Sequence, residues 1–293
     1  MESFINYSEK IGNNFLLCQG PGGNTSIKTE NKILIKKSGH LLSQSKNKNT
    51  FKKVKLNDIK SFYENAQNER KFDQSLSIET PLHVLLDSKY IFHYHSIASI
   101  LISAIYNKNE LDKKLINNNI LPIKYIRPGL KLASEINNRN KKYNFDSFFL
   151  YNHGVVIEDN NVSSLYKKIL SMESLFSELI DYKKLKLVAR EVINLEFKNC
   201  KIKNLYPEIN YSSFKDKYLF PDHPVFFPNS FEYDNDYIYF DKKLNPVELI
   251  YFKVLFVLYI LIDDKKIRNY IKKDTGIKLR SSKDEQLRIK INK

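Results

Sequence analysis

Two histidines, His93 and His95, lie two positions apart in a short segment whose other residues are β-branched or aromatic. Such residues favour a β-strand, and side chains two apart on a strand point to the same face. Two imidazoles from one strand and a third from elsewhere form the usual three-histidine set of a catalytic Zn²⁺. His153 is the candidate third imidazole, and Glu79 is a candidate carboxylate beside it. The His93–His95 spacing alone is equally compatible with a structural histidine pair.

A glycine-rich segment at residues 20–24 separates a short apolar run from two predicted strands, at 26–28 and 32–35. A dinucleotide-binding fingerprint requires a helix directly after its glycines, and here the sequence predicts a strand. Consecutive glycines also let backbone N–H groups converge on an anion, with Asn24 and Ser26 adding side-chain hydrogen bonds. A plain hairpin turn explains the segment equally well, so both interpretations stay open.

The rest of the chain predicts alternating helices and strands. Thr80 is a candidate N-cap followed by a proline, and Ser96 is placed to cap the next helix. His83 is expected to be structural, and His223 to pack at the surface in a proline-rich loop. The expected helices cover residues 56–66, 81–86, 97–105, 163–195 and 249–262, and further strands cover residues 148–151 and 155–157.

The net charge of +15 raises the question of nucleic-acid binding, but the basic residues are scattered and form no recognisable binding module. We expect no specific nucleic-acid partner, although a positive field favours anionic substrates such as sugar phosphates. The two cysteines match no disulfide or metal pattern and no signal peptide is evident, which predicts a cytoplasmic protein. The longest apolar stretch contains Lys253 and is too short to span a bilayer. The charged stretch 272–293 is expected to be partly disordered.

Five motifs follow one another along the chain: Gln19–Lys28, Ser38–Gly39, Ser77–His83, His93–His95 and Asn152–Gly154. In order and context they resemble the class II aldolase/adducin family, over roughly the first two hundred residues. The form of Ser77–His83, together with residues 125–129, is most similar to the aldolase part of rhamnulose phosphate aldolase/alcohol dehydrogenase-like proteins.

The resemblance implies a three-layer α/β/α sandwich around a central, mainly antiparallel sheet. It places the metal-binding domain in residues 1–200 and leaves residues 201–293 as a partly helical C-terminal extension. It also implies a homo-oligomer, often a tetramer, and a Zn²⁺ ion or another divalent metal such as Mn²⁺ or Co²⁺. The implied metal ligands are His93, His95, His153 and Glu79. The implied contacts to a substrate phosphate are Gly23, Asn24, Ser38, Gly39 and Ser77.

The resemblance further implies a lyase that cleaves or forms a carbon–carbon bond of a sugar or sugar phosphate through an enediolate. Glu79 would act as acid/base once substrate displaces it from the metal, and Tyr125 would donate a proton to the leaving aldehyde oxygen. Alternatives on the same scaffold are a decarboxylase or epimerase of a sugar phosphate, or a non-catalytic adducin-like binding protein. Ile78 stands where many family members have a second serine, so a non-phosphorylated or nucleotide-linked sugar is also compatible.

Overall fold

A computed structural model describes residues 1–65, 72–227, 231–262 and 267–292. Its centre is a seven-stranded sheet in the order β3-β2-β1-β4-β7-β6-β5. All neighbouring strands pair antiparallel except β5 and β6, which are parallel. The mainly antiparallel sheet predicted from the sequence is therefore confirmed. The strands are β1 (Asn24–Lys28), β2 (Lys32–Lys36), β3 (Phe51–Lys55), β4 (Tyr90–Tyr94), β5 (Leu121–Ile123), β6 (Ser147–Leu150) and β7 (Gly154–Asp159).

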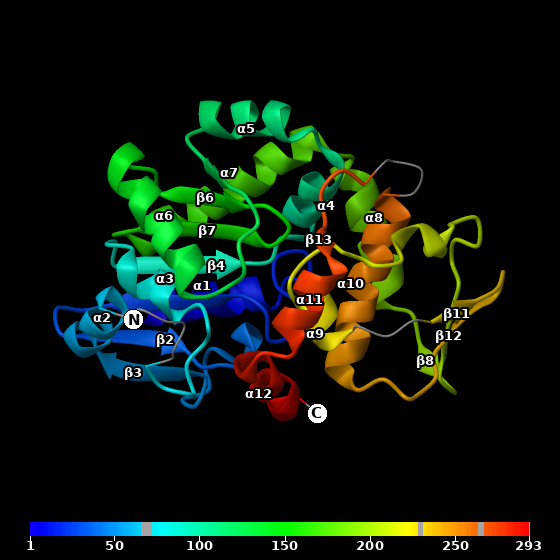
Figure 1. Cartoon of the computed structure of the whole chain (residues 1–293), viewed down its shortest axis with the longest axis horizontal. Coiled ribbons are helices and arrows are strands. Elements are labelled where there is room, and N and C mark those ends of the chain that lie inside the picture. The colour runs from blue at the N-terminus through cyan, green and yellow to red at the C-terminus, as the bar shows by residue number, and fades with distance from the viewer. Residues whose placement is uncertain (66–71, 228–230, 263–266, 293) are drawn as a thin grey trace.

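Helices cover both faces of this sheet, which gives the expected three layers (Figure 1). Strand β4 shows how its sequence separates the two cores. Tyr90, Phe92 and Tyr94 enter the core shared with α1, α4 and α7, whereas Ile91 enters the core shared with α2, α3 and α6. The helices of these layers are α1 (Glu2–Gly12), α2 (Leu56–Glu64), α3 (Thr80–Leu85), α4 (Ile97–Ile105), α5 (Lys108–Asn117), α6 (Leu130–Tyr143), α7 (Val162–Leu179) and α8 (Tyr182–Ile193).

Four helix ends show where the sequence predictions hold and where they fail. Ser96 caps α4 as predicted, its side chain accepting a hydrogen bond from the Ser99 N–H. Thr80 does not cap α3, because its hydroxyl donates to the Ser77 carbonyl and the helix begins one residue earlier, with Glu79 at the N-cap. The helix predicted over 163–195 is two helices, because Asp181 caps a new one by accepting from the Lys184 N–H. The helix predicted over 56–66 ends at Glu64, and residue 66 lies outside the described residues.

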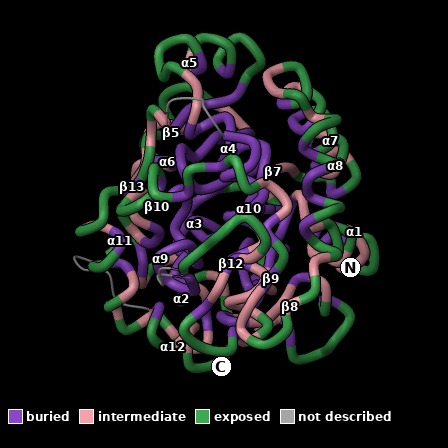
Figure 2. Tube along the Cα trace, turned by 90° about the vertical axis from the view of Figure 1, so that its right-hand side faces the viewer, coloured by how far each residue is buried: buried purple, intermediate pink, exposed green. Residues whose placement is uncertain are grey.

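The C-terminal extension packs onto the same core as α1, α4 and α7, so the hydrophobic core does not divide near residue 200. Helix α10 (Pro246–Ile262) contributes to this contact along much of its length. Its residues from Tyr251 to Ile262 are all buried except Lys253. Each fully buried large apolar side chain contributes about 1.5–3 kcal/mol. Buried segments gather in the middle of the molecule (Figure 2). Within the described residues, no helix combines the length and apolarity needed to cross a bilayer.

The extension also corrects two expectations. Disorder was expected over 272–293, but Lys273–Arg280 and Lys283–Ile291 form helices, because Leu279 and Glu285 are buried; residue 293 lies outside the described residues. His223 is 6% exposed and belongs to α9, where its Nδ1 accepts from the Leu219 N–H. The remaining elements are α9 (Asp222–Phe226), α10 (Pro246–Ile262), α11 (Lys273–Arg280), α12 (Lys283–Ile291), β8 (Phe197–Lys198), β9 (Lys201–Lys203), β10 (Lys217–Tyr218), β11 (Glu232–Tyr233), β12 (Tyr237–Tyr239) and β13 (Ile271–Lys272).

Candidate metal centre

Four buried side chains bring their donor atoms together at one end of the central sheet. The donor atoms of Glu79, His93, His95 and His153 all lie within 4.8 Å of one another. Glu79 Oε1 is 3.2 Å from the Nε2 atoms of both His93 and His153, and the Nε2 atoms of His93 and His95 are 3.0 Å apart. The sequence predicted this set, and the fold brings all four members together.

The four donors reach the cluster from three parts of the fold. His93 projects to the same side of β4 as Ile91, the side on which α3 packs, so the residue that precedes α3, Glu79, lies close to it. His95 follows directly at the end of the strand. His153 sits in the turn between β6 and β7, where its N–H donates to the Leu150 carbonyl.

Acceptor oxygens close to Nδ1 favour one tautomer in two of the imidazoles. The Nδ1 atom of His93 lies 3.0 Å from the Val155 carbonyl oxygen, and that of His95 lies 3.0 Å from Asp222 Oδ2. These oxygens only accept, so in its neutral form each ring carries its hydrogen on Nδ1 and turns the Nε2 lone pair toward the cluster. Two such nitrogens 3.0 Å apart require a positive charge between them, which a proton on His93 or a metal ion supplies. The donor set therefore fits a divalent metal ion bound by three imidazoles and a carboxylate.

The electrostatics of the cluster favour a positive charge where the donors converge. Burial opposes ionisation of the Glu79 carboxyl, but the charge of His93 and the close contacts of Oε1 with His153 and His93 hold its pKa well below the usual value. Burial also disfavours a charged His93, yet Glu79 raises the pKa of that ring above normal. Burial lowers the pKa of His95, and it lowers that of His153 to about 4, so both rings are neutral at pH 7.

A chain of hydrogen bonds orients the Glu79 carboxylate. Ser26 Oγ lies 2.8 Å from His83 Nδ1, and His83 Nε2 contacts the side-chain oxygen of Asn24. The Asn24 oxygen accepts from His83, so the Asn24 amide nitrogen is directed at Glu79 Oε2, 2.7 Å away. Burial lowers the pKa of His83 to about 3, so the ring is neutral. His83 thus supports the site structurally, as the sequence predicted, and is not a member of the donor cluster.

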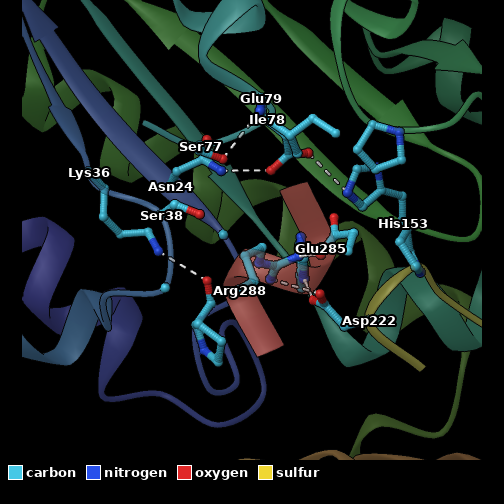
Figure 3. A pocket seen from close by; sticks show the side chains of 16 residues that line it. Asn24, Lys36, Ser38, Ser77, Ile78, Glu79, His153, Asp222, Glu285 and Arg288 are labelled. Atoms are coloured by element: carbon cyan, nitrogen blue, oxygen red, sulfur yellow. Dashed lines mark hydrogen bonds and ion pairs between the residues drawn. The ribbon is translucent and has the colours of Figure 1, made fainter. Parts of the chain in front are cut away.

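A narrow cavity of about 20 Å³ lies beside the cluster, enough for a single water molecule. All five residues expected to contact a substrate phosphate line it, namely Gly23, Asn24, Ser38, Gly39 and Ser77. Gly23 has a φ of +63°, and a Cβ there would lie 2.9 Å from the His93 carbonyl oxygen, so only glycine fits. Within the described residues, the buried Ser38 hydroxyl has no hydrogen-bond partner. Figure 3 shows these side chains around the opening.

Sequence reasoning missed four charged residues that line the same cavity. Lys36, on β2, donates to the carbonyls of Pro21 and His40, and burial lowers its pKa to about 8. The other three, Asp222, Glu285 and Arg288, come from the C-terminal extension (Figure 3). All four were missed because no sequence spacing links them to the histidines.

Tyr125 does not line this cavity. It borders a second cavity of about 370 Å³, together with Asn152, the residue directly before His153. Burial raises the pKa of the Tyr125 hydroxyl, which has no hydrogen-bond partner among the described residues. Its role as proton donor stays a prediction.

Comparison with known proteins places this geometry in a family. A model of the class II aldolase and adducin N-terminal domain matches residues 3–180. A curated protein of Bacillus subtilis strain 168, the uncharacterized oxidoreductase YuxG, is 28% identical over 199 residues, 59% of this chain and 28% of that protein. The chain thus spans little more than a quarter of that relative's length.

A solved structure is similar as well. It is the N-terminal class II aldolase domain of a conserved protein from Thermoplasma acidophilum, with 25% identity and a TM-score of 0.51. The similarity covers 60% of this chain and 92% of the other. With the family model spanning more than half of the sequence and the same fold in a solved relative, this chain belongs to the class II aldolase and adducin family.

Proposed function

We propose that the protein is a zinc-dependent aldehyde-lyase that cleaves or forms a carbon–carbon bond of a sugar or sugar phosphate. The observation that carries this proposal is the buried convergence of three imidazoles and one carboxylate beside a cavity lined by hydroxyl and amide groups. A structural metal site would be closed by its ligands, whereas this one adjoins a cavity through Glu79, His95 and His153.

A bound divalent ion supplies Lewis-acid stabilisation of the negative charge that develops on substrate oxygens when the bond breaks. Glu79 removes or returns the proton, since its carboxylate is ionised and lines the cavity. Asn24 holds Oε2 of this carboxylate in place. Neutral imidazoles from His95 and His153 suit the ligand role because they leave the ion its full charge.

The substrate proposal rests on the opposite side of the cavity. Ser38 and Ser77 supply hydroxyl groups, and the free Ser38 hydroxyl suits a phosphate oxygen. Lys36 adds a buried positive charge, which favours an anionic group over a neutral one. Ile78 also lines the cavity and adds no polar contact. The homo-oligomer and the cytoplasmic location expected from the sequence remain part of this proposal.

The test begins with the purified protein. Its metal content is measured by elemental analysis, and ketoses, ketose phosphates and 3-oxo acids are then screened for aldehyde, carbon dioxide or epimeric products, with and without added Zn²⁺, Mn²⁺ or Co²⁺. Aldehyde release that a chelator abolishes supports the lyase. Carbon dioxide or an epimer as the product would replace it with a decarboxylase or an epimerase. Protein that binds none of these ions and turns over no substrate would leave a non-catalytic, adducin-like role.

A further inference from the structure

Asp222 connects the metal cluster to the C-terminal extension, outside the part of the chain that the family model matches. Its side chain is 1% exposed. Oδ2 lies 3.0 Å from His95 Nδ1 and accepts a hydrogen bond from the Tyr251 hydroxyl, also at 3.0 Å. Oδ1 accepts from Arg288 Nη2 at 2.9 Å (Figure 3). Each carboxylate oxygen thus has its own partners.

The glycine-rich loop leaves space for the contact between Asp222 and His95. A Cβ at Gly22 would lie 2.8 Å from His95 Nδ1 and 3.2 Å from Asp222 Oδ2. Both distances are too short for an undisturbed contact, so a side chain at position 22 would displace one partner. Gln19, in the same loop, donates to the His95 carbonyl, and its own backbone carbonyl lies 3.1 Å from the Tyr251 hydroxyl oxygen. The loop therefore holds the histidine backbone while Asp222 holds its ring.

From these contacts we infer that Asp222 is a positioning residue that sets the tautomer of His95 and so completes the metal centre. The inference rests on the metal centre proposed above. Because a carboxylate only accepts hydrogen bonds, it holds the His95 hydrogen on Nδ1 and leaves the Nε2 lone pair for the metal. Arg288 only donates, so it fixes the orientation that any amide at position 222 would adopt.

This orientation makes Asp222→Asn a sharp test. The amide oxygen must face Arg288, so the amide nitrogen faces His95 Nδ1 and donates to it, and the His95 hydrogen moves to Nε2. Removing a residue that hydrogen-bonds a metal-bound histidine typically lowers metal affinity about 10–100-fold. We expect Zn²⁺ affinity, measured by competition with a chromogenic chelator, to fall roughly 10–100-fold. In the double variant Asp222→Asn/Arg288→Met the amide is free to turn, and affinity should recover to within about tenfold of wild type.

Two control variants separate this role from a general loss of packing. Tyr251→Phe removes another hydrogen bond to the same carboxylate oxygen without changing the tautomer. Glu158→Gln removes a buried carboxylate that accepts from Ser88 and Asn140 and contacts no imidazole. Both should keep Zn²⁺ affinity close to wild type. Equal affinity in Asp222→Asn and wild type overturns the inference, and so does a double variant that binds no better than Asp222→Asn.

A measurement on the wild-type protein covers the case in which Asp222→Asn does not fold. In Zn²⁺-loaded protein labelled with ¹⁵N-histidine, the His95 ring, assigned with a His95→Gln variant, should show a protonated Nδ1 and a metal-bound Nε2. The opposite pattern overturns the inference. If wild-type protein binds no divalent metal at all, the proposed function itself fails, which distinguishes that result from failure of the Asp222 role.

Discussion

Glu173, on α7, is a buried carboxyl close to Tyr94 on β4, the strand that also carries His93. Burial raises its pKa from 4.5 to about 7, and the nearby hydroxyls of Ser96, Tyr182 and Tyr94 limit the rise, with Tyr182 donating a hydrogen bond to Oε2. The folded protein therefore binds this proton more tightly than the unfolded chain does. Stability is lost as the pH rises from about 4.5 through 7. Since a tenfold change in proton affinity corresponds to about 1.4 kcal/mol, the full loss is about 3 kcal/mol.

The replacement Glu173→Gln removes this titration. We expect urea unfolding, followed by circular dichroism from pH 5 to pH 8, to show that the variant gains about 2–3 kcal/mol relative to wild type across that range. Glu178→Gln, which changes an exposed carboxyl on the same helix, is the matched control and should follow wild type. A Glu173→Gln variant whose stability falls with pH as steeply as that of wild type would refute the reasoning.

The other predictions concern the metal centre. His93→Ala should lower metal affinity at least about 100-fold, because it removes one of the three imidazoles. Elemental analysis after dialysis checks this, and full metal content would contradict it. Glu79→Gln should keep metal through the histidines but lose about 10²–10⁴-fold in turnover, and wild-type turnover would exclude Glu79 as acid/base. Zn²⁺ at 100 times its Kd should stabilise the fold by about 2.7 kcal/mol, and an unchanged melting temperature would contradict binding to the native state.

The parts of the fold that sequence predicted are those decided by local chemistry. The β-branched and aromatic residues around His93 fix a strand, and its period of two puts both imidazoles on the face where Glu79 arrives. Ser96 caps a helix because its hydroxyl can accept from a nearby N–H. Residues matched by short motifs, such as Gly23, were likewise placed at the site in advance.

The missed parts depend on contacts between residues far apart in the chain. No periodicity links Asp222 to His95, because α9 lies beside the cluster through its packing against α10 and α12. The charged end of the chain resembled a disordered tail because composition does not show that Arg288 pairs with Glu285, which is buried. Tyr125 was predicted as the proton donor from its neighbours in sequence, but it borders a different cavity from the one beside the cluster.

The small cavity beside the cluster has a consequence for binding equilibria. A cavity of about 20 Å³ is far below the several hundred Å³ that small-molecule sites usually provide, so part of its lining must move before a sugar enters. The end of the chain is the piece we expect to move, since α12 contributes Glu285 and Arg288 to the lining. Apparent substrate affinity then equals intrinsic affinity multiplied by the fraction of open molecules. Substitutions in α12 that do not contact substrate would therefore change KM. A variant whose α12 amides exchange hydrogen faster should have a lower KM.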